Sequence, residues 1–183
     1  MQAAFLYTDA FSRFDYGANH PLKPFRLRLT YELIRACGLL GENDPRLIEP
    51  SPASLDDLLA FHTRDYLDAL QASNGGVPAP NAGSFGIGPG DNPAFPGMYD
   101  WSALIAGATL RAAGMVDDGE VPVAFNISGG LHHALAGRAS GFCYINDAVL
   151  AIRRLVGGGS LISTSTPITE TGSRARSTTR TAC

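Results

Sequence analysis

Apolar residues alternate along the chain between short runs and longer segments with a helical repeat. Short runs at residues 3–8, around 47–48 and at 121–127 predict strands, and the last of these, which is rich in β-branched and aromatic residues, predicts a buried one. Apolar positions at every third or fourth residue predict helices in the longer segments, which are residues 24–39, 54–73, 98–115 and 145–155. Strands that alternate with helices predict an α/β fold, in which a parallel sheet is flanked by helices on both faces.

The first predicted helix shows the pattern well. Pro24 fits a first helical turn, where its missing N–H costs nothing. After it, Phe25, Leu29, Leu33 and Cys37 form one apolar stripe at helical spacing. This segment therefore predicts a helix with a distinct apolar side.

The character of the chain changes after Val156. Three glycines at 157–159 lead into a stretch with almost no large apolar residue and no repeat. Taken at face value, such a stretch predicts a disordered polar tail. The pattern thus divides the chain into one domain over residues 1–156 and a tail over residues 157–183.

Composition limits the class of protein. With 183 residues, 45% hydrophobic content and a formal net charge of −3, the chain suits one soluble globular unit. Its 14 Lys and Arg residues are spread, so we expect no direct nucleic-acid binding. Three widely spaced cysteines suggest reduced thiols, and no apolar run is long enough for a signal peptide or a membrane span. A cytoplasmic location follows most simply.

Candidate chemistry lies in the turn after residues 121–127. His132 and His133 stand next to each other behind Ser128–Gly129–Gly130, beyond the carboxyl end of the predicted strand. Ligands bind at such ends in α/β sheets, and a histidine pair can divide the giving and taking of a proton. The alternative is that the two histidines cap or line a loop. A phosphate loop at Gly129 and Gly130 is disfavoured, because no Gly-Lys-Ser/Thr follows.

Two blocks of sequence resemble one known family. The string GGLHHALAGRASGFCYINDAVLAI is similar to the GGLHHA...SGFCYVNDIVLAI motif of the zinc-dependent histone deacetylases, a family that includes the bacterial acetoin-utilisation proteins. The earlier block YGANHPLKPFR, residues 16–26, is similar to that family's YGQGHPMKPHR. The resemblance covers residues 3 to about 156. It implies a truncated arginase/deacetylase-like parallel sheet and hydrolysis of acetyl-lysine or a related acetamide.

The resemblance also implies roles for single residues. His132 and His133 would move protons in catalysis. Asp91, in a Gly- and Pro-rich loop over residues 74–97 that resembles the family's NVGEDCP, would grip the substrate backbone, or else merely stabilise a turn. Gly141 would allow close approach of the substrate, and Phe142 would form a wall of the acetyl-lysine tunnel, or else belong to the core.

Two further residues correspond to the internal cavity of the family, which are Tyr16 and Arg26. An ordinary surface cation is the alternative for Arg26, whereas an internal guanidinium would need hydrogen-bond acceptors. His62 fits a packing or capping residue.

The family's metal ligands are missing from the chain as it is read. In that family an Asp, a His and a further Asp hold zinc, and the first two belong to a DIDxHHGDG motif expected after Val156. Permitted codons for residues 162–183, read one base out of step, give LDIDAHHGDGVEGAFYDTDRV. We therefore interpret residues from about 157 onward as frameshifted. The chain itself would bind no zinc, and we expect an inactive fragment.

Two other functions remain open. One is a deacetylase of small acetylated amines or polyamines, since Gly90 replaces a second acidic residue of the family's rim. The other is a non-catalytic remnant that binds acetyl-lysine. The expected partner is thus an acetylated lysine peptide or an acetylated amine.

Overall fold

A computed structural model describes residues 3–41 and 44–156 of the chain. Its centre is a parallel sheet of three short strands in the order β2-β1-β3. The strands are β1 (Ala4–Leu6), β2 (Leu47–Ile48) and β3 (Ala124–Asn126). Phe5 lies opposite Leu47 on one side and Phe125 on the other, which fixes the register. The predicted α/β fold with a parallel sheet is confirmed. β1 and β3 are shorter than the predicted runs at 3–8 and 121–127, and the prediction that the latter is a buried strand is wrong for the described residues, since Phe125 is 53% exposed.

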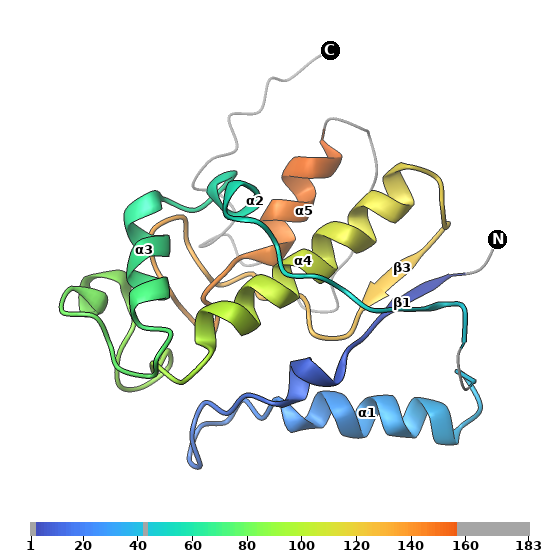
Figure 1. Ribbon diagram of the computed structural model, residues 1–183, viewed down its shortest axis with the longest axis horizontal. Coiled ribbons are helices and arrows are strands. Elements are labelled where there is room, and N and C mark those ends of the chain that lie inside the picture. The colour runs from blue at the N-terminus through green and yellow to red at the C-terminus, as the bar shows by residue number, and fades with distance from the viewer. Residues whose placement is uncertain (1–2, 42–43, 157–183) are drawn as a thin grey trace.

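Helices cover the two faces of this sheet (Figure 1). On one side lies α1 (Phe25–Ala36), and on the other side α4 (Met98–Asp117) packs together with α5 (Asp147–Leu155). The shorter helices α2 (Leu55–Leu59) and α3 (Arg64–Ala72) lie towards one end of α4. Two single 3-10 turns, Asp9–Ser12 and Ala82–Phe85, complete the regular structure.

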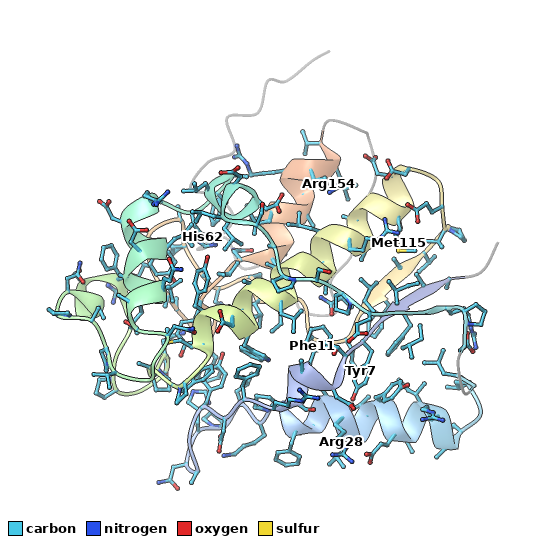
Figure 2. The ribbon with its side chains drawn as sticks, viewed as in Figure 1. Tyr7, Phe11, Arg28, His62, Met115 and Arg154 are labelled. Carbon is cyan, nitrogen blue, oxygen red and sulfur yellow. The ribbon has the colours of Figure 1, made fainter. Side chains whose placement is uncertain are left out.

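The core is built around α4, against which the sheet, α3 and α5 pack. Alternate residues of β1 point to opposite faces, so Ala4 and Leu6 are buried while Phe5 is half-buried towards α1. Tyr7, just after β1, stacks on Tyr31 of α1 with ring centroids 3.8 Å apart, and Figure 2 shows Tyr7 between the sheet and this helix. Ile105 of α4 is fully buried in this core. In residues 3–41 and 44–156, no helix combines the length and apolarity that a membrane span needs.

The apolar stripe of α1 does not face the sheet. Leu27 and Tyr31 make that contact instead, whereas Phe25, Leu29 and Leu33 lie largely in solvent, with Leu33 63% exposed. Helical geometry explains this, because residues 27 and 31 lie on one side of the helix and residues 25, 29 and 33 lie on another. Within the described residues, α1 therefore has two apolar sides, and the core partly covers one of them.

The predicted tail over residues 157–183 lies outside the described residues. The first domain boundary, at Val156, coincides with the residue that follows α5. The division of the chain into a domain and a frameshifted tail stays a prediction.

Substitutions on the exposed side and on the packed side of α1 should have different effects. We expect Leu29→Glu combined with Leu33→Glu to reduce self-association of the 183-residue chain and to change its free energy of unfolding by no more than about 0.5 kcal/mol. Leu27→Glu, the matched control on the packed side, should destabilise by about 1–2 kcal/mol, because it removes apolar packing and places a charge on a half-buried side. Urea unfolding and light scattering measure both effects. Equal destabilisation by the two kinds of variant would contradict this description of α1.

Candidate active site at the carboxyl edge of the sheet

The chain turns sharply where β3 ends. The side chain of Asn126 ends the strand, because its Oδ1 accepts the backbone N–H of Ser128 at 3.1 Å and the Ser128 hydroxyl at 2.8 Å. The backbone N–H of Gly129 donates to the Asn126 carbonyl at 3.3 Å. The histidine pair follows directly, at the carboxyl edge of the sheet, as predicted from the position of the apolar run.

His132 is buried, with 2% of its surface exposed. Its Nδ1 lies 2.8 Å from the carbonyl oxygen of Gly130. A carbonyl can only accept, so Nδ1 carries the proton and the lone pair of the neutral ring resides on Nε2. That Nε2 is buried and has no hydrogen-bond partner among the described residues. An unpartnered buried polar atom costs about 1–3 kcal/mol, which marks Nε2 as the place for a water or a reacting group.

His133 lies beside it and is less buried. The two ring centroids are 4.3 Å apart, with the planes tilted by 38°. The backbone of Gly141 packs against the ring of His133, so that a Cβ at this position would come within 2.8 Å of Cγ. Gly141 also has φ +51°, in the left-handed region. In this structure the glycine makes room for a histidine ring, and its predicted contact with the substrate stays a prediction.

Phe142 follows with a strained backbone. Its φ of +70° is the one positive value found at a non-glycine position of the described residues. The hydroxyl of Tyr16 donates to its carbonyl at 2.7 Å, and the ring of His20 meets its ring edge-on at 4.7 Å. The ring of Phe142 is half-buried, so the residue is not simply part of the core. Backbone strain of this kind persists where the surroundings hold it in place, most often at functional sites.

Asp91 is exposed in the neighbouring loop. Its carbonyl oxygen lies 3.1 Å from Nε2 of His20, and Asn92 donates through Nδ2 to the Cys143 carbonyl at 3.3 Å. The hydroxyl of Tyr144 donates to the Pro93 carbonyl. The loop that carries Asp91 is thereby attached to the loop that carries Phe142, and His20 contacts both.

The two predicted cavity residues lie in different surroundings. Tyr16 is buried among Phe95, Trp101 and Tyr144, and this burial holds the pKa of its hydroxyl far above the usual range. Arg26 is exposed on α1, so the described residues do not enclose it. Its predicted place in an internal cavity remains a prediction, and here it has the exposure of the surface alternative.

His62, predicted to be a packing or capping residue, has a structural role beside the site. Its Nε2 accepts the backbone N–H of Asn146 at 3.0 Å, and its Nδ1 lies 3.2 Å from the Ala136 carbonyl. Figure 2 shows it next to α3. Burial lowers its pKa to about 4, so the ring is neutral near pH 7. Its partners lie 74 and 84 residues away in the sequence, and sequence reasoning did not connect them.

Two further residues were missed, which are Asn146 and Asp147 at the start of α5. Both are almost completely buried. An asparagine directly before an apolar helical repeat is a recognised N-cap signal, and it could have marked Asn146 from the sequence. No comparable signal predicts that a neighbouring aspartate is buried.

The described residues do not fit a zinc site. No group of three or more His, Cys, Asp or Glu side chains among them is arranged to hold a metal ion. The thiol of Cys143 is no substitute, because burial raises its pKa to about 12 and it donates to the Gly141 carbonyl at 3.3 Å. The same burial disfavours a cysteine nucleophile beside the histidine pair.

The low pKa of His62 makes stability depend on pH. Unfolding raises the pKa of the His62 ring from about 4 to its ordinary value of 6.5. The unfolded chain therefore takes up a proton as the pH falls from 6.5 towards 4. The stabilisation is complete above pH 6.5 and is lost towards pH 4, by about 3 kcal/mol in all. Unfolding free energies from urea titrations between pH 7.5 and 4 should show this slope, and His62→Gln should remove it. An identical slope in the two proteins would contradict the assignment.

The two described cysteines should differ in reactivity. Cys37 is exposed and Cys143 is buried. At pH 8 we expect iodoacetamide to modify Cys37 at least about 100-fold faster, because a thiol with a raised pKa forms little thiolate. Peptide mass spectrometry separates the two sites, and the difference should vanish in urea. Equal rates in the folded protein would show that the Cys143 thiol is accessible.

Comparisons with known proteins agree with one another. A model of the histone deacetylase domain matches residues 20–161. The chain is 37% identical over 152 residues to the acetoin utilization protein AcuC of Bacillus subtilis, which covers 82% of this chain and 39% of that protein. It is 40% identical over 161 residues to histone deacetylase 3 of Oryza sativa subsp. japonica, covering 85% of this chain and 31% of that protein.

The fold comparison gives the same result. The structure matches the crystal structure of a histone deacetylase homologue from Aquifex aeolicus with a TM-score of 0.75 and 35% sequence identity, over 87% of this chain and 42% of that one. The predicted arginase/deacetylase-like sheet is thereby confirmed for the part described. This chain spans less than half the length of each of these relatives. With the domain match, the two identities and the shared fold together, this chain belongs to the histone deacetylase family.

Proposed function

We propose that the complete protein to which this sequence corresponds hydrolyses the acetamide of acetyl-lysine, and that the present 183-residue chain is inactive. The observation that supports this proposal is the buried Nε2 of His132, which carries a lone pair and has no partner among the described residues. A proton acceptor of this kind, beside a second histidine, suits general acid–base catalysis.

The two histidines would divide the proton transfers. Nε2 of His132 would accept a proton from the attacking water while the water oxygen forms a bond to the acetyl carbon. His133, partly exposed and 4.3 Å away between ring centroids, would give a proton to the departing amine as the C–N bond breaks. Acetate and the free amine result. His132 then releases the proton that it took from water and His133 takes one up from solvent, so the protons balance over the cycle.

Substrate contacts would come from the two attached loops. The half-buried ring of Phe142 offers an apolar wall for the methylene chain of lysine. Asp91, exposed nearby, offers carboxylate oxygens to backbone N–H groups of a peptide. Tyr16 would support this arrangement through its 2.7 Å hydrogen bond to the Phe142 carbonyl.

The proposed inactivity concerns the metal. In the family, zinc activates the attacking water, and the described residues supply no site for it. We propose that residues from about 157 onward are read out of frame, and that the shifted frame encodes the missing DIDAHHGDG motif. The domain match ends at residue 161, within the interval between Val156 and residue 162 where the frame would change. The cytoplasmic location predicted from the cysteines likewise stays a proposal.

Restoring the frame tests both halves of the proposal. DNA sequencing across codons 155–163 should reveal one base lost or two gained. The 183-residue chain should show no zinc-dependent turnover of an acetyl-lysine peptide, whereas the frame-restored protein should. His132→Ala in the restored protein should lower kcat by about 10²–10⁴, which is the usual contribution of a general base. Zinc-dependent turnover by the 183-residue chain would disprove its inactivity, and an inactive but folded restored protein would disprove the reaction.

Small acetylated amines are the second candidate substrate. Gly90, with φ +107° and open space around it, stands where the family has a second acidic residue beside Asp91. One carboxylate at the rim gives a weaker grip on a peptide backbone. Comparing an acetyl-lysine peptide with an acetylated polyamine in the frame-restored protein separates the two, through the ratio of their kcat/KM values.

A further inference from the structure

The start of α5 lies directly behind the histidine turn. Asp147 is 1% exposed, and its two carboxylate oxygens accept hydrogen bonds from that turn. Oδ1 accepts the backbone N–H of Leu131 at 2.7 Å, and Oδ2 accepts the backbone N–H of Gly130 at 2.9 Å. A buried carboxylate needs such donors, so these two bonds are strongly favoured over any alternative conformation of the turn.

One peptide unit connects this carboxylate to the reactive ring. The N–H of Leu131 and the carbonyl of Gly130 belong to the same peptide group, which is planar and trans, so they point in opposite directions. The N–H points to Asp147, and the carbonyl points to Nδ1 of His132 at 2.8 Å. Holding one end of this peptide group therefore aims the other end at the ring.

Asn146 holds the next part of the same turn. It is fully buried, and its Nδ2 donates to the carbonyls of His132 at 3.0 Å and Ala134 at 2.8 Å. Its Oδ1 accepts the N–H of Val149 at 3.0 Å, which caps α5. Asn146 and Asp147, at the start of α5, thus bind backbone groups before, within and after the histidine pair.

The carboxylate of Asp147 has little room to move. The Thr109 hydroxyl of α4 donates to Oδ2 at 2.6 Å, and Asn126 donates to that hydroxyl at 2.9 Å. On the turn side, a Cβ added to Gly129 would come within 2.8 Å of Oδ2, so only glycine fits there. The position of the carboxylate is set jointly by α4, α5 and the end of β3.

We infer that Asp147, assisted by Asn146, is a positioning residue that selects the proton-accepting tautomer of His132, by aiming the Gly130 carbonyl at Nδ1. Its significance for catalysis rests on the proposed function, whereas the positioning itself is a property of this chain. In this arrangement Asp147 does not touch a substrate. It acts through one peptide group, and the lone pair on Nε2 of His132 is the result.

Histidine NMR of the 183-residue chain tests this directly, because the chain has only four histidines. We expect the ¹⁵N shifts of His132 to show a proton on Nδ1 in the unsubstituted protein. The amides of Gly130 and Leu131 should exchange slowly, like those of a protected helix. A proton on Nε2 of His132, or rapid exchange of both amides, would overturn the inference without any variant.

Asp147→Asn then tests the cause. A side-chain amide has one oxygen, so it can accept from only one of the two turn amides at full strength. We expect at least about 10-fold faster exchange at Gly130 and Leu131 and a mixture of His132 tautomers, with α4 amides and the His20 ring unchanged. The matched control Asp68→Asn, at an exposed carboxylate paired with Arg64, should change none of these. The inference fails if exchange accelerates equally throughout α4, or if His132 keeps its tautomer.

The outcome is independent of turnover. If the frame-restored protein proves inactive while Asp147→Asn alters the His132 tautomer, the proposed function fails and the positioning role stands. If the restored protein is active and the tautomer is insensitive to Asp147, the function stands and the positioning role fails.

Discussion

The structure at the carboxyl edge of the sheet depends on how one buried carboxylate is satisfied. Removing the charge of Asp147 from water carries a penalty of several kcal/mol, which must be offset by hydrogen bonds from its surroundings. Burial raises its pKa, while the donors from Thr109, Gly130 and Leu131 oppose this rise. These donors come from α4 and from the turn after β3, so satisfying the carboxylate brings α4, α5 and the sheet edge together. The shape of the histidine turn follows from the same requirement.

Two buried tyrosines hold the other side of the site through their hydroxyl groups. Tyr16 and Tyr144 bury their rings in an aromatic cluster and donate their hydroxyls to backbone carbonyls of the two loops that carry Phe142 and Asp91. A buried tyrosine hydroxyl needs a partner, and here the partners are the carbonyls of Phe142 and Pro93. The hydrogen bond from Tyr16 thereby holds the strained backbone at Phe142 in place.

The described residues leave apolar surface uncovered. Within them, β3 pairs with β1 on one side, and Val123 and Phe125 are more than half exposed. The outer side of α1 adds Phe25, Leu29 and Leu33. Exposed apolar faces and strand edges favour association with other surfaces. The fold match covers 42% of the Aquifex aeolicus homologue, so that protein extends well beyond the part that it shares with this chain.

The sequence determined the class of fold, because strand and helix repeats are local and the alternation of the two leaves few arrangements. It also located the histidine pair, since a turn that follows a strand must lie at the sheet edge, although β3 itself is not buried. It did not reveal which side of α1 is covered, because Leu27 and Leu29 are equally apolar and only packing distinguishes them.

The tertiary structure alone decided how the histidines are held. Asp147 contacts a turn 16 and 17 residues earlier, and His62 contacts Asn146 across 84 residues. No periodicity in the sequence records such contacts, because they arise when distant segments close around polar groups that water can no longer reach. The sequence thus specified that a histidine pair lies at the sheet edge. The burial of Asn146 and Asp147 next to this pair fixed the orientation of the His132 ring.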